Sequence, residues 1–97
     1  MQSLFIPASV IAKLKLKHGV SRQEVLECFE NRSGAFLTDD REEHRRNPPT
    51  LWFVAETRKR RRLKVVFQSR SVKSYIITAY EANPDEVRIY EKYSQKN

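Results

Sequence analysis

The sequence predicts an α+β fold with two N-terminal helices, an antiparallel sheet of three to four strands, and a C-terminal helix. Three observations predict it: helix-start signals near both ends, three β-rich segments between them, and the order of these elements. The 97 residues suit one domain, 1–97, with a modest core. The chain has no long apolar run, no signal-peptide pattern and a single cysteine, so we expect a cytoplasmic protein that does not contact membranes.

The N-terminal part predicts two helices. Residues 1–6 favour a short strand or an ordered arm, and Pro7 suits the first turn of a helix that ends at Gly19, after two cationic residues. Ser21 and Glu24 have the spacing of a capping box, which predicts a second helix that begins at Ser21 and ends near Arg32 and Gly34. Cys28 lies on or beside the apolar stripe of that helix, so we expect a core residue rather than a reactive thiol.

The sheet is predicted from segments 51–57, 62–68 and 74–80, which are rich in β-branched and aromatic residues. Residues 35–38 favour a further short strand, and the charged segment 39–49 after it is too polar to be buried. The last helix is predicted to begin at Asn83-Pro84-Asp85-Glu86. That stretch provides an N-cap, a proline at the first helical position and acids in the first turn.

Alternation along each strand sorts the side chains into two faces. The core face is predicted to hold Leu63, Val65 and Phe67. The opposite, polar face is predicted to gather Trp52, Glu56, Arg62, Lys64, Thr78 and Tyr80, with Ile76 among the side chains that point the same way. Such a face suits RNA binding, and a solvated face with a Glu56–Lys64 cross-strand pair is an equally good interpretation of the pattern alone.

A basic heptad, residues 58–64, carries six positive charges of a net charge of +7. It lies where the strand pattern requires a turn, yet it contains no Gly, Asn, Asp or Pro. So concentrated a charge favours polyanion binding over a simple solvated hairpin tip. Basicity alone does not choose between RNA, DNA, anionic lipid and an acidic partner protein.

Several short stretches, KHGVS at 17–21, RLKVVF at 62–67 and YIITAYE at 75–81, carry a family resemblance. In them the chain resembles the BrnT toxin family, within the RelE/ParE-like ribonuclease superfamily. The resemblance implies a RelE-like fold and the toxin component of a type II toxin–antitoxin system. The implied activity is metal-independent cleavage of RNA by its own 2′-hydroxyl, without a cofactor. The implied partners are RNA, including ribosome-bound mRNA, and a cognate antitoxin protein.

The resemblance also implies roles for individual residues. Arg62 and Lys64 would bind the phosphate, a histidine would shuttle the proton with Glu56 as an alternative base, and Tyr80 would donate a proton or stack on a base. The candidate catalytic residues are His18, His44, Glu56, Lys64 and Tyr80, and the candidate RNA-binding residues are Arg41, Trp52, Arg58, Lys59, Arg60, Arg61 and Arg62.

Other interpretations remain open at this point. His18 also suits a helix end, His44 an exposed loop, and Trp52 the core. No ligand set is regularly spaced for a metal. A non-catalytic nucleic-acid-binding protein and a module that docks an acidic partner protein are the alternative functions. Assembly as a homodimer is left open.

Overall fold

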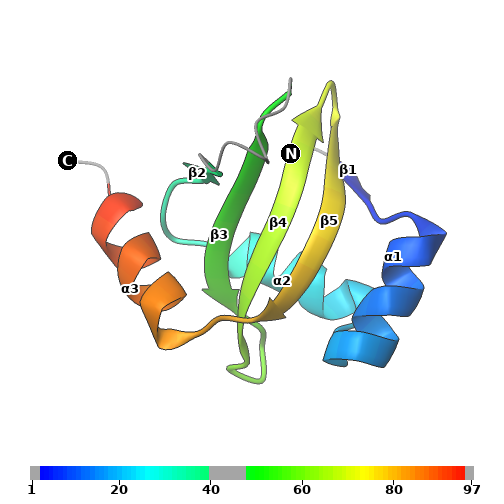
Figure 1. Cartoon of the computed structure of the whole chain (residues 1–97), viewed down its shortest axis with the longest axis horizontal. Coiled ribbons are helices and arrows are strands. Elements are labelled where there is room, and N and C mark those ends of the chain that lie inside the picture. The colour runs from blue at the N-terminus through cyan, green and yellow to red at the C-terminus, as the bar shows by residue number, and fades with distance from the viewer. Residues whose placement is uncertain (1–2, 40–47, 96–97) are drawn as a thin grey trace.

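The computed structural model of the chain describes residues 3–39 and 48–95, and the predictions for Arg41 and His44 lie outside these residues. The fold is α+β (Figure 1). Its elements are β1 (Ser3–Phe5), α1 (Ala8–Lys13), the π-helical turn η1 (Leu14–His18) that continues α1, α2 (Arg22–Asn31), β2 (Leu37–Thr38), β3 (Thr50–Glu56), β4 (Arg62–Arg70), β5 (Lys73–Glu81) and α3 (Pro84–Tyr93).

The sheet has five strands in the order β1-β5-β4-β3-β2. All neighbours are antiparallel except β1, which pairs parallel to β5 from Ser3 opposite Lys73 to Phe5 opposite Tyr75. The prediction of a purely antiparallel sheet of three to four strands is therefore wrong. A three-residue strand is too short to show alternation, and its direction is set by its pairing with β5 rather than by its own residues.

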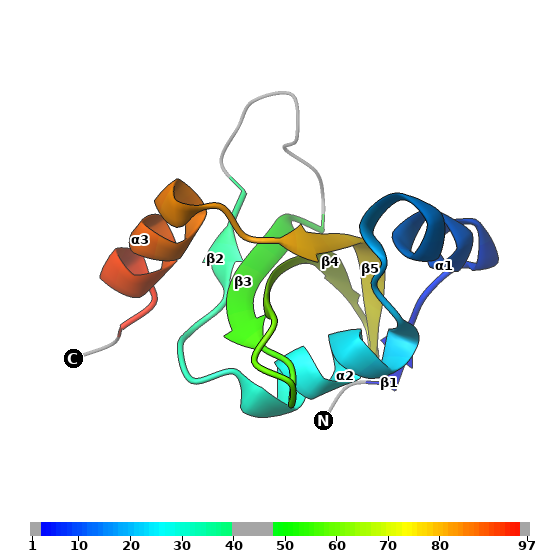
Figure 2. The ribbon, with the colours of Figure 1, turned by 90° about the horizontal axis from the view of Figure 1, so that it is seen from below.

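The sheet curves over α2, which covers one of its faces (Figure 2). The other helices lie toward its margins, α1 beside β5 and α3 beside β3 (Figures 1 and 2). The face opposite α2 is therefore flanked by η1 on one side and by α3 on the other.

The core lies between α2 and the sheet. The predicted core side chains Leu63, Val65 and Phe67 are all buried, which confirms the alternation of β4. Cys28 is also buried, as expected: its Sγ lies 3.6 Å from the Ala55 carbonyl oxygen, and burial raises the pKa of its thiol to about 12. A thiol in that environment is protonated and unreactive at neutral pH.

One prediction about faces is wrong because of a register shift. Between Val66 and Phe67 the pairing of β4 with β5 slips, so that Phe67 lies opposite Ile76 instead of Ile77. Ile76 consequently joins the core at 2% exposure, whereas strict alternation had placed it on the same face as Tyr80. An extra residue in one strand reverses the face of every side chain beyond it.

The helix starts predicted at Ser21 and at Asn83 are confirmed. Ser21 and Glu24 form a complete capping box at α2, and Asn83 and Glu86 form a second one at α3. The first helix ends as predicted at Gly19, whose φ of 61° lies in the left-handed region that glycine adopts without a steric penalty.

Candidate functional site

The basic heptad covers the turn between β3 and β4 and the first three residues of β4. Its turn is closed by hydrogen bonds from the Thr57 amide to the Arg61 carbonyl and from the Arg60 amide to the Thr57 carbonyl, both 2.9 Å. Arg60 has a φ of 63° without being glycine, which costs of the order of 1 kcal/mol. Lys59 and Arg60 are exposed at the tip, and neither forms an ion pair within the described part of the chain.

The other four cations of the heptad are held by carboxylates of the protein itself. The pairs are Arg58 with Glu30 at 3.4 Å, Arg61 with Glu24 at 3.1 Å, Arg62 with Glu56 at 3.3 Å and Lys64 with Glu86 at 3.0 Å. These acids lie on α2, β3 and α3. The ion pairs therefore hold the hairpin against both helices. The expected Glu56–Lys64 pair does not form, because Lys64 lies opposite Val54 and Glu56 lies opposite Arg62.

Among the described residues, Arg61 is the one of these four cations whose side chain also bonds to backbone carbonyl oxygens, and it is 24% exposed. Its guanidinium donates to the carbonyl oxygens of Gly19 at 2.7 Å and His18 at 2.9 Å, and to both carboxylate oxygens of Glu24 at 3.1 Å. These carbonyls belong to the end of the first helix, where backbone acceptors lack helical partners. Arg61 therefore fixes the segment that carries His18, and its predicted part in RNA binding stays a prediction.

Apart from Ile76, which the register shift moves into the core, the polar sheet face forms as the alternation predicted. The register places Lys64 opposite Tyr80 and Trp52 opposite Val66. The Lys64 ammonium lies 4.5 Å from the centre of a Trp52 ring and 5.9 Å from that of the Tyr80 ring. Trp52 is also packed against Tyr90 of α3, with ring centres 5.9 Å apart, so only part of its surface is open to a ligand.

His18 joins this cluster from η1. Its ring centre lies 5.7 Å from that of Tyr80. The structure thus brings together the predicted residues His18, Lys64, Tyr80 and Trp52, which come from four different elements. We call these four residues, together with Glu86, the sheet-face cluster.

Glu86 was not among the predicted site residues, although it contacts two of them. Its Oε2 accepts hydrogen bonds from the Lys64 ammonium at 3.0 Å and from the Tyr80 hydroxyl at 3.1 Å. Its Oε1 accepts from the Asn83 amide in the capping box of α3. An acid in the first turn of the last helix was expected from the sequence for its favourable position near the helix N-terminus, and nothing in the local pattern points from Glu86 to Lys64 or Tyr80.

The electrostatics of the cluster follow from these contacts. Burial raises the pKa of Tyr80, and the Glu86 charge raises it further against the opposing effect of Lys64. Burial also raises the pKa of Glu86, but hydrogen bonds from the Asn83 amide and from Lys64 outweigh it and lower the pKa overall. At neutral pH the cluster therefore holds a neutral phenol between an ammonium and a carboxylate, next to an imidazole.

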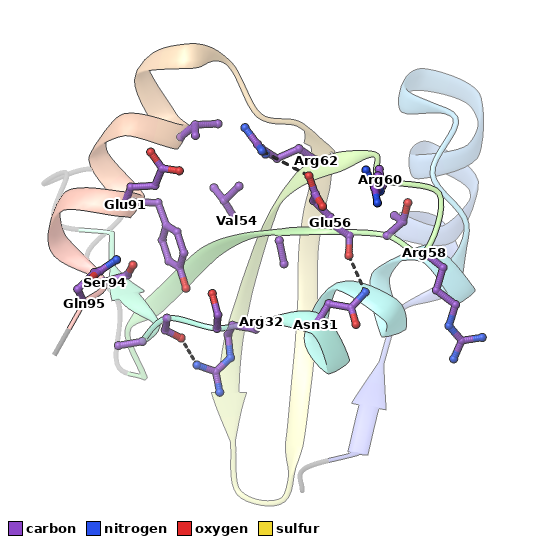
Figure 3. Close-up of a pocket in the computed structure, with 17 residues that line it drawn as sticks. Asn31, Arg32, Val54, Glu56, Arg58, Arg60, Arg62, Glu91, Ser94 and Gln95 are labelled. Atoms are coloured by element: carbon purple, nitrogen blue, oxygen red, sulfur yellow. Dashed lines mark hydrogen bonds and ion pairs between the residues drawn. The ribbon is translucent and has the colours of Figure 1, made fainter.

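A groove of about 1040 Å³ lies beside the cluster, between α3, β3 and the hairpin (Figure 3). Four residues predicted for RNA binding or catalysis, Glu56, Arg58, Arg60 and Arg62, line it. Glu56 pairs with Arg62 at this groove and not with Lys64. Over the described ranges 3–39 and 48–95, no group of three metal-ligating side chains is present.

The chain matches no protein-family model, and no curated protein matches its sequence. None of the helices in the part of the chain that the structure describes is long and apolar enough to cross a membrane.

Proposed function

We propose that the protein is a metal-independent endoribonuclease with a RelE-like fold, the toxin of a type II toxin–antitoxin system that acts in the cytoplasm on RNA. The observation that supports it most is the sheet-face cluster. RNA cleavage needs a proton acceptor, a proton donor and a cation close together. His18, Tyr80 and Lys64 can supply the acceptor, the donor and the cation. The Tyr80 ring lies beside both the His18 ring and the Lys64 ammonium.

The reaction proceeds by transfer within the RNA. The neutral imidazole of His18 takes the proton of a 2′-hydroxyl, whose oxygen forms a bond to the adjacent phosphorus. The bond from phosphorus to the 5′-oxygen breaks, and Tyr80 gives its proton to that oxygen. The products are a 2′,3′-cyclic phosphate and a 5′-hydroxyl end, and the His18 imidazolium returns the proton to Tyr80.

Lys64 stabilises the charge that builds up on the phosphate and then on the Tyr80 phenolate. In the free protein the Glu86 carboxylate binds both Lys64 and Tyr80. The RNA phosphate must displace this carboxylate before Lys64 can bind the phosphate. Glu86 therefore keeps the two groups in place until RNA arrives. The cognate antitoxin, in this proposal, would cover the same basic surface.

The first test combines growth with RNA analysis. Induced expression should arrest growth and give new 5′-hydroxyl ends in total RNA, and purified protein should cut RNA in the presence of a metal chelator. His18→Ala, Tyr80→Phe and Lys64→Ala should each lower the cleavage rate at least a hundredfold at equal protein level. Lys15→Ala, a change at an exposed lysine of η1, is the matched control and should cut normally. Normal growth with intact RNA would exclude the toxin function in that host.

A non-catalytic RNA-binding protein is the second candidate. The observation that favours it is the pairing of Lys64 with Glu86, which leaves the two side chains only 14% and 17% exposed. In this case purified protein would retain RNA without producing cyclic phosphate ends. Tyr80→Phe would then leave RNA affinity unchanged.

A further inference from the structure

The groove beside α3 is distinct from the sheet-face cluster. Its walls are the end of α2 and the loop that follows, the C-terminal end of β3, the hairpin, and one side of α3 (Figure 3). The charged and amide side chains that line it are Arg32, Arg58, Arg60, Arg62, Glu56, Glu91, Asn31 and Gln95.

The arginines make the groove cationic. Four arginines face two glutamates among its lining residues. Arg60 forms no ion pair within residues 3–39 and 48–95, and the side chains of Arg58 and Arg62 are 68% and 51% exposed. Exposed guanidinium groups bind phosphate oxygens with two parallel hydrogen bonds, and their pairs with surface carboxylates are weak enough to exchange.

The remaining polar groups suit nucleobases. Glu91, Asn31 and Gln95 offer carboxylate and amide groups that can bond to the edges of unpaired bases, and Figure 3 shows Glu91 on α3 across the groove from Asn31. The same carboxylates argue against an acidic peptide, which Glu56 and Glu91 would repel. In contrast, the Glu56 and Glu91 carboxylates can accept hydrogen bonds from the amino groups of cytosine, adenine or guanine.

We propose that this arginine groove binds single-stranded RNA next to the cleavage position, with phosphates on Arg60 and Arg62 and a base against Glu91 and Asn31. The proposal rests on the proposed function and adds a site that decides base preference. Arg62 and Lys64 point to the same face of β4 two residues apart, which is about 7 Å along a strand. A backbone held at Arg62 can therefore reach the sheet-face cluster.

The experiment measures binding in a His18→Ala background, where RNA is not consumed. Labelled A, C, G and U decamers are titrated by fluorescence anisotropy at several salt concentrations. Arg60→Ala with Arg62→Ala should weaken binding of all four decamers at least tenfold. It should also reduce the slope of log affinity against log salt by about 1.4, since each single-strand phosphate contact contributes about 0.7. Glu91→Gln should leave that slope unchanged and alter the ratio of affinities among the decamers.

The matched control is Lys13→Ala with Lys15→Ala, which removes the same charge from exposed positions of the first helix. If the arginine double variant behaves like this control while the unmodified protein still cleaves RNA, the groove proposal is overturned and the proposed function stands. If Glu91→Gln leaves all four affinities in the same ratio, the assignment of base reading to Glu91 is overturned. If no decamer binds to any form, the groove proposal fails; if the unmodified protein also leaves RNA uncut, the proposed function fails with it.

Discussion

Replacing Arg61 tests most directly whether this residue of the basic heptad stabilises the fold. Arg61 was predicted to contact RNA, yet its guanidinium is bonded to the end of the first helix and to α2. Replacing it with alanine should therefore destabilise the fold itself. The same substitution at Arg60, which lies in the same turn and forms no ion pair within the described residues, should not.

The magnitude follows from the bonds that are lost. Arg61→Ala removes hydrogen bonds to two carbonyl oxygens, at about 1 kcal/mol each, and leaves these acceptors dependent on water. It also removes the two-bond pair with Glu24, for which about 0.5–1 kcal/mol is appropriate at 24% exposure. The expected loss is about 2–3 kcal/mol, or a fall in Tm of about 10–20 °C for a domain of this size.

Urea and thermal unfolding followed by circular dichroism measure this loss. Arg60→Ala should change the free energy of unfolding by less than about 0.5 kcal/mol. Arg61→Lys should recover less than half of the loss, because one ammonium cannot bond to both carbonyls and the carboxylate as the planar guanidinium does. If Arg61→Ala proves as stable as Arg60→Ala, Arg61 does not hold the hairpin to the helices.

Three further predictions concern single residues. Glu86 has a lowered pKa, so its contribution to stability is present above its ordinary pKa and is lost as pH falls. Glu86→Gln should therefore destabilise more at pH 7 than at pH 3.5, and an equal cost at both pH values in urea unfolding would contradict this. Gly34→Ala would place a Cβ 2.5 Å from Ser94 Oγ and should cost about 1–3 kcal/mol, measured by the same unfolding assay. Cys28, with a thiol pKa of about 12, should resist iodoacetamide at pH 8 for hours and react quickly in denaturant; rapid alkylation of the native protein would show that the thiol is accessible.

Local patterns determined much of the fold. The capping box at Ser21 and the N-cap at Asn83 are contacts between residues three positions apart, so the sequence alone predicts them. Alternation likewise assigned Lys64 and Tyr80 to one face, since the period of a strand depends only on backbone geometry. The same reasoning failed at Ile76, where the extra residue in the pairing of β4 with β5 depends on two strands at once.

The tertiary structure alone decided how the charges are used. The sequence shows six cations in one heptad, but not that Glu24 lies against Arg61, 37 residues away, or that Glu86 lies against Lys64, 22 residues away. Ion pairs and hydrogen bonds depend on distances of a few ångströms, and no short-range period of the chain specifies them across such separations. The sequence by itself therefore determined the kinds of side chain on the sheet face and in the hairpin. Folding decided which cations stabilise the protein and which remain exposed to a ligand.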